Sequence, residues 1–173
     1  MTRISSVLTH TIGVAVLLFG LAQGVPTDDR PSASVTIKVK LFYATSGELS
    51  ADMLGTDAPP LVNVVAGTDP STASLVIVAV TSATDDVIAS DSHVRLVAQE
   101  LTPTPGTRNV PRRRLLLDRT VRVGPVGRGG TTHAAFWLAD IGCRPVTLQA
   151  TLSRARQQGQ VVARATLPFA CGE

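Results

Sequence analysis

Aromatic residues and cysteine are both scarce in this chain of 173 residues. Aromatic side chains make up 3% of it, and only two cysteines occur, Cys143 and Cys171. Proteins that bind single-stranded nucleic acid stack the bases on aromatic rings, and carbohydrate sites need a similar exposed platform. The shortage of rings therefore argues against nucleic acid as a partner, in spite of the basic composition, and weakens a carbohydrate-binding interpretation.

Histidine is also rare, and no catalytic motif is present. Only His93 and His133 lie beyond the amino-terminal region. Asp85, Asp86 and Asp91 precede His93 closely enough to suggest a cation site, but a polar turn entering a strand is the commoner reason for such a cluster. The Gly-x-Ser-x-Gly nucleophile elbow does not occur. The sequence thus predicts no metal, no cofactor and no catalytic machinery.

No apolar run is long enough to span a membrane. The longest, Ile12–Ala22, has about 11 residues, whereas a transmembrane helix needs about 20. It follows Arg3 and precedes the small residues of Ala22-Gln23-Gly24, which is typical of a secretory signal peptide. We predict that residues 1–24 are removed by cleavage between Gly24 and Val25, that no transmembrane segment remains, and that the protein is secreted or periplasmic. An uncleaved anchor is the alternative.

The rest of the chain suits a flexible leader, residues 25–34, and one domain, residues 35–173. An even cysteine count in an exported protein indicates a disulfide, here between Cys143 and Cys171. Closing that loop would stabilise the fold by about 3.5 kcal/mol in the chain-entropy model.

Two-residue alternation of apolar and polar side chains dominates the domain, and it is the pattern of half-buried strands. Glu48–Leu54 is the exception and predicts one or two turns of helix. We predict a single-domain antiparallel β-sandwich of immunoglobulin-like architecture. Its eight expected strands are Val35–Leu41, Leu61–Val65, Leu75–Val80, His93–Gln99, Leu115–Val123, Thr132–Leu138, Val146–Leu152 and Val161–Phe169.

The last two strands predict their own register. Directly opposed residues share a face, so residue numbers across this pair should sum to an odd value, for example Val146 opposite Phe169. Cys143 and Cys171 break that rule, because their numbers sum to an even value. A bend before Pro145 is therefore needed to bring them together.

Charge is divided unevenly between the two halves. Residues 25–100 contain four basic and ten acidic groups, whereas residues 101–173 contain eleven arginines and three acidic groups. Such polarity indicates either a basic binding face or two halves that attract one another within one fold.

The segment "PRRRLLLDRT", residues 111–120, concentrates this positive charge. The structural interpretation is a solvated loop that ends at Arg114 and leads into an edge strand protected by its charges. The functional interpretation is an anion site, since guanidinium groups bind phosphate and carboxylate bidentately. A protease-sensitive loop is a third possibility. The candidate ligand-binding residues are Arg108, Arg112, Arg113, Arg114 and Arg128, the last at the tip of the hairpin turn "GPVGRGG".

Phe136 and Trp137 are neighbours on one expected strand, so they point to opposite faces. One belongs to the core, and an exposed Trp137 would be an interface candidate.

Together these features predict an exported binding or scaffold module without catalytic activity. Its partner would be an envelope or extracellular protein, or an anionic surface polymer, recognised through the arginine-rich surface of residues 108–128. One alternative is an exported hydrolase or metal-dependent enzyme with a dispersed site. The other is a structural subunit that docks by a sheet edge.

Processing can be checked by intact mass spectrometry of the exported protein. We expect the amino terminus at Val25 and a mass two hydrogens lower than that of the reduced chain, because Cys143 and Cys171 are joined. A full-length chain, or a mass unchanged by reduction, would contradict these expectations.

Overall fold

The computed structural model describes residues 33–56, 58, 71, 73–83, 85–102, 112–139, 141, 144–154 and 160–169. Within this part of the chain there are seven strands and no helix. The strands are β1 (Ala33–Phe42), β2 (Ala73–Ser82), β3 (His93–Thr102), β4 (Arg112–Arg122), β5 (Thr131–Leu138), β6 (Val146–Ser153) and β7 (Gln160–Leu167).

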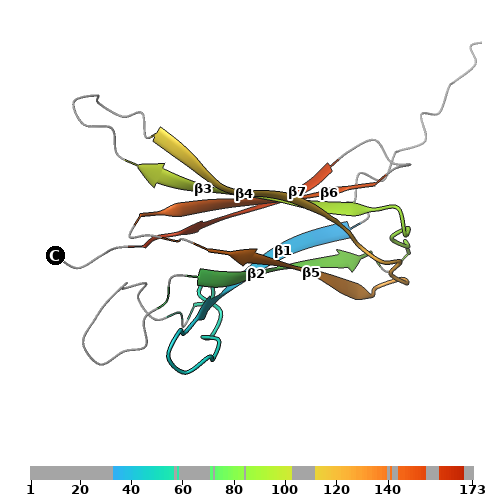
Figure 1. Ribbon diagram of the computed structural model, residues 1–173. Helices are drawn as coiled ribbons and strands as arrows, with labels where there is room; N and C mark the ends of the chain where they lie inside the picture. The colour runs from blue at the N-terminus through green and yellow to red at the C-terminus, as the bar shows by residue number, and fades with distance from the viewer. Residues whose placement is uncertain are drawn as a thin grey trace, which may run out of the picture.

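The strands form two antiparallel sheets that lie one above the other (Figure 1). One sheet has three strands in the order β1-β2-β5, and the other has four in the order β4-β3-β6-β7. The predicted all-β sandwich is confirmed at this level, and its immunoglobulin-like architecture stays a prediction. The expected strand Leu61–Val65 lies outside the described residues. β1 begins at Ala33, so the last two residues of the expected leader belong to the sheet.

Alternation explains the core. Inward residues of the central strands β2, β3 and β6, and most of those of β5, are buried. Each large apolar side chain removed from water contributes about 1.5–3 kcal/mol. The central strands supply most of them, as their apolar sequences predicted. The largest fully buried side chains include Val76, Val78 and Val80 of β2, Val94 and Leu96 of β3, Phe136 and Leu138 of β5, and Leu148 and Leu152 of β6.

The register of β6 and β7 obeys the predicted parity. Val146 lies opposite Leu167, and Leu152 lies opposite Val161. The pair given as an example, Val146 with Phe169, is displaced by two residues, which keeps every side chain on its expected face. Phe169 is still buried, just beyond the end of β7. Cys143 and Cys171 lie outside the described residues, so their disulfide stays a prediction.

The helical turn predicted for Glu48–Leu54 is not confirmed, because this segment follows the edge of β1 instead. The Leu41 N–H donates to Ser50 Oγ at 2.9 Å, and the Val39 N–H donates to Asp52 Oδ1 at 3.0 Å. Serine and aspartate side chains compete with helix formation by bonding backbone groups in this way. The segment thereby occupies part of a sheet edge that would otherwise be open to mispairing.

The two faces of β6 should differ sharply in how much a substitution lowers the free energy of unfolding. Leu148→Ala should lower the free energy of unfolding by about 2–5 kcal/mol, because it removes a buried side chain and leaves a cavity. Thr151→Ala, on the outer face of the same strand, should change it by no more than about 0.5 kcal/mol. Urea denaturation measures both, and equal effects would show that the faces are wrongly assigned.

Candidate ligand-binding groove on the four-stranded sheet

The arginine-rich segment is a strand from its first arginine. β4 begins at Arg112, not at Leu115, so the expectation that the loop extends to Arg114 is corrected. The reason is pairing: Arg112, Arg113 and Arg114 lie opposite Thr102, Leu101 and Glu100 of β3, which is longer than its apolar alternation indicated. β4 is an edge strand, as the structural interpretation of this segment predicted.

The five candidate arginines do not form one patch. Arg113 lies on the outer face of the sheet, while Arg112 and Arg114 lie on the side of the core. Arg128 is exposed in the connection between β4 and β5, beyond the opposite end of β4. This connection joins the two sheets, so the expected hairpin turn is corrected. Arg108 lies outside the described residues. The register between β3 and β4 shifts by one residue between Ala98 and Gln99, at a bulge. Odd-numbered residues of β4 face outward before the bulge and even-numbered ones after it, so the arginines at the two ends of β4 follow different parity.

Arg114 is neutralised rather than available. Its Nε and Nη2 donate to Oε2 of Glu100, at 3.1 and 2.5 Å. Arg144 Nη1 lies 3.3 Å from the other carboxylate oxygen of Glu100 and also donates to Thr102 Oγ1 at 2.9 Å. Glu100 is buried, with 4% of its surface exposed. A buried carboxylate needs such partners, because an unpaired charge away from water is costly.

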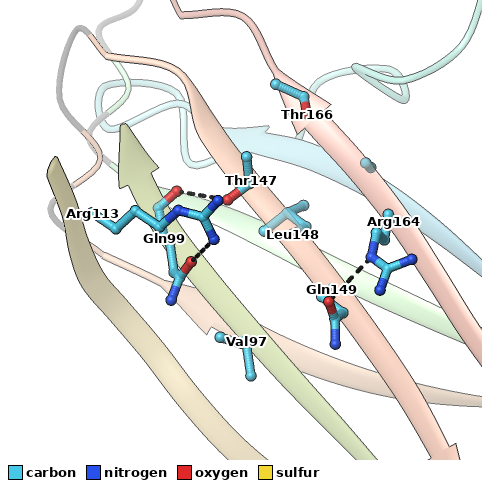
Figure 2. A pocket seen from close by; sticks show the side chains of 9 residues that line it. Val97, Gln99, Arg113, Thr147, Leu148, Gln149, Arg164 and Thr166 are labelled. Atoms are coloured by element: carbon cyan, nitrogen blue, oxygen red, sulfur yellow. Dashed lines mark hydrogen bonds between the residues drawn. The ribbon is translucent and has the colours of Figure 1, made fainter. Parts of the chain in front are cut away.

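Arg113 instead borders a groove of about 420 Å³ on the outer face of the four-stranded sheet. All four strands contribute, because the outward residues of β4, β3, β6 and β7 lie side by side in register. Figure 2 shows Arg113 reaching over β3 toward Thr147, and Arg164 on the far side of β6. The groove is lined by Val97, Gln99, Arg113, Thr147, Leu148, Gln149, Arg164, Ala165 and Thr166.

Both arginines of the groove are held by neutral partners. Arg113 Nη1 donates to Gln99 Oε1 at 3.4 Å, and Arg164 Nε donates to Gln149 Oε1 at 3.2 Å. None of the described residues that line the groove is acidic. The groove therefore presents two positively charged groups whose charge is not neutralised by the side chains around them.

One carboxylate beside the groove in the strand register is already paired. Asp118 of β4 lies opposite Val97, and it accepts two hydrogen bonds from Arg95, at 2.7 and 2.6 Å. These bonds hold the pKa of Asp118 below its usual value of 3.8. The same contact raises the pKa of Arg95. Asp118 thus stays ionised and paired with Arg95.

A second groove, of about 470 Å³, lies where the edges of the two sheets meet. Val35 and Ile37 of β1 line one side and Ala163 and Ala165 of β7 the other, and Arg164 lies between the two grooves because it lines both.

The two histidines are not brought together. His93 and His133 lie on the outer faces of different sheets, and neither lines a groove described above. In the described part of the chain no three His, Cys, Asp or Glu residues are grouped as metal ligands are. Nor does that part hold a helix of the length and apolarity needed to cross a bilayer.

Sequence reasoning missed Arg164, Gln99 and Gln149. Their outward positions follow from alternation, but their convergence depends on the strand order, in which β6 lies between β3 and β7. The comparisons add no relative: no protein-family model matches the chain, and no curated protein matches it.

The Arg95–Asp118 pair predicts how the stability of the fold depends on pH. A carboxyl pKa that is depressed by folding stabilises the native state above the unfolded pKa, and this stabilisation is lost as the pH falls through the folded pKa. Carbon-detected NMR titration should find the Asp118 pKa below 3.8, and Arg95→Gln should raise it toward that value. Arg122→Gln removes another cation from the same face and should leave it nearly unchanged. An Asp118 pKa insensitive to Arg95→Gln would refute the assignment.

Proposed function

We propose that this protein is an exported binding module that recognises an anionic ligand in the groove on its four-stranded sheet. One observation carries the proposal: Arg113 and Arg164 border a groove that no described carboxylate lines. A guanidinium has five N–H donors, and the hydrogen bond to glutamine takes one of them in each case. The remaining donors are suited to carboxylate or phosphate oxygens.

The spacing of the arginines favours an extended ligand over a single small anion. β4 and β7 are separated by three strand spacings, about 14 Å, and Arg113 leans toward the middle of the groove (Figure 2). An anionic chain laid across the strands would meet both guanidiniums, while Thr147 and Thr166 offer hydroxyl groups along its path. Acidic segments of an envelope or extracellular protein and anionic surface polymers both have this chemistry.

The neighbourhood of the groove favours binding over catalysis. Its lining contains no histidine, cysteine or carboxylate among the described residues, so it offers no evident general base or nucleophile. Nor does that lining contain an aromatic ring on which a base would stack. These features support the binding module over the hydrolase or metal-dependent enzyme.

Titration with poly-L-glutamate at low and high salt tests the proposal. We expect binding that weakens as salt rises, because exposed charge pairs are screened. Arg113→Gln and Arg164→Gln should each lower the affinity about tenfold, which corresponds to the loss of one charge-assisted interaction of about 1.4 kcal/mol. Inorganic polyphosphate as a second probe distinguishes carboxylate from phosphate preference.

Arg119→Gln is the matched control. Arg119 is exposed on the same strand and loses the same charge, but it lies opposite Leu96 on the other side of the sheet. The affinity of the Arg119→Gln variant should stay within about twofold of that of the wild type, because a distant surface charge has only a small effect. Equal losses in all three variants would show that binding follows net charge rather than the groove, and absence of binding by the folded wild type to either polymer would contradict the proposal.

A further inference from the structure

The outer face of the three-stranded sheet is apolar where a solvated face should be polar. Antiparallel sheets with one face in water alternate apolar-in and polar-out. β6, which lies between two strands of the four-stranded sheet, follows that rule with Thr147, Gln149 and Thr151 outward. β2, in the same position in its own sheet, instead places Leu75, Ile77 and Ala79 outward, of which Leu75 and Ile77 are partly exposed and Ala79 is buried.

Aromatic rings extend this apolar surface across the sheet. Trp137 of β5 is 47% exposed, although tryptophan is the largest apolar side chain of the protein. Its ring meets the ring of Phe42 from β1 edge to face, with centroids 5.3 Å apart. Ala73, the residue of β2 opposite Phe42, is small enough to let the two rings approach across the central strand. Phe42, Leu75, Ile77 and Trp137 thus form a partly exposed apolar patch on this face, and such patches mark interfaces.

Positive charge lies along one margin of this surface. Lys38 and Lys40 point outward from β1, which is one edge of the sheet. None of the described outward residues of the three strands is acidic. Whatever covers the face must therefore place either carboxylates or aromatic rings opposite the lysines.

The strand register arranges cations and rings as a self-complementary set. Lys40, Leu75 and Trp137 form one row across β1, β2 and β5, with the cation at one margin and the indole at the other. Lys38, Ile77 and Ala135 form the next row but one along the chain.

A two-fold axis parallel to β2 would lay β1 of one copy over β5 of the other. Each Lys40 would then face the indole of the other copy's Trp137, in the arrangement of a cation–π contact. Each Lys38 would face Ala135, and Leu75 and Ile77 would meet their own copies at the centre. An axis across the strands would instead stack β1 on β1 and oppose the lysines. Only the first arrangement makes the face isologous without like charges in contact.

We propose that this face is the interface of a homodimer, formed by two copies of this chain about a two-fold axis parallel to β2. An acidic partner would also satisfy the lysines, but the second copy requires nothing that the face does not itself carry. The two sheets lie one above the other (Figure 1), and the groove is on the outer face of the four-stranded sheet, so the proposed dimer would leave it open to solvent.

Sedimentation equilibrium of the processed protein over a concentration series tests this proposal. Three strands make a small interface, so we expect a reversible dimer rather than a permanent one. Ala135→Lys should convert it to a monomer, because the new ammonium group would oppose Lys38 of the other copy. Ala135 is exposed and small, so the variant should fold, and circular dichroism confirms whether it does.

Charge reversal identifies the axis. Adding Lys38→Glu to the Ala135→Lys variant should restore the dimer, because each introduced carboxylate would meet an introduced ammonium group across the interface. Val162→Glu is the control: it places a charge on an exposed aliphatic position of the other sheet and should leave the dimer intact.

Three outcomes would overturn the proposal. If the wild-type protein stays monomeric at every concentration, the homodimer is refuted, and an acidic partner remains as the molecule that could cover the face. A dimer that persists in the folded Ala135→Lys variant would place the interface elsewhere. A double variant that remains monomeric while folded would exclude the proposed axis. None of these results depends on whether the groove binds an anion.

Discussion

Packing of the inner face of one sheet against the inner face of the other is the constraint on which the rest of this protein depends. Phe136 and Val76 from the three-stranded sheet belong to the same buried cluster as Leu96 and Leu148 from the four-stranded sheet. Because side chains alternate along a strand, burying one set commits the other to the outside. The outward position of Arg113 on one side and of Trp137 on the other follows from this burial, and a slip of one residue would reverse both.

Electrostatics then act on a surface that the core has already arranged. The four ion pairs formed between described residues each join the acidic half, residues 25–100, to the basic half, residues 101–173: Arg95–Asp118, Arg114–Glu100, Arg144–Glu100 and Arg154–Asp86. These pairs support the interpretation that the two halves attract one another within one fold. Interleaving of the two halves pairs several arginines with carboxylates, whereas the strand order places glutamine and threonine beside Arg113 and Arg164.

The two outer faces differ in chemistry in a way that suits separate tasks. The face of the four-stranded sheet carries a groove bordered by Arg113 and Arg164, and the face of the three-stranded sheet carries Leu75, Ile77 and Trp137 with its lysines at one margin. If the latter joins two copies, the grooves would lie on opposite sides of the dimer. An extended anionic polymer could then be bound at two points, and the effective concentration of the second site would raise the overall affinity without new contacts.

The sequence by itself predicted seven of the strands and the parity of the last pair, because alternation is a local property of the chain. It also indicated that Arg112, Arg113 and Arg114 lie beside the start of an edge strand, although it began that strand at Leu115 instead of Arg112. Only the tertiary structure decided that Glu100 neutralises Arg114, that Arg113 and Arg164 border one groove, and that Lys40 and Trp137 share a row. Strand order and register bring these residues together, and both depend on contacts between segments far apart in the chain, which no local pattern encodes.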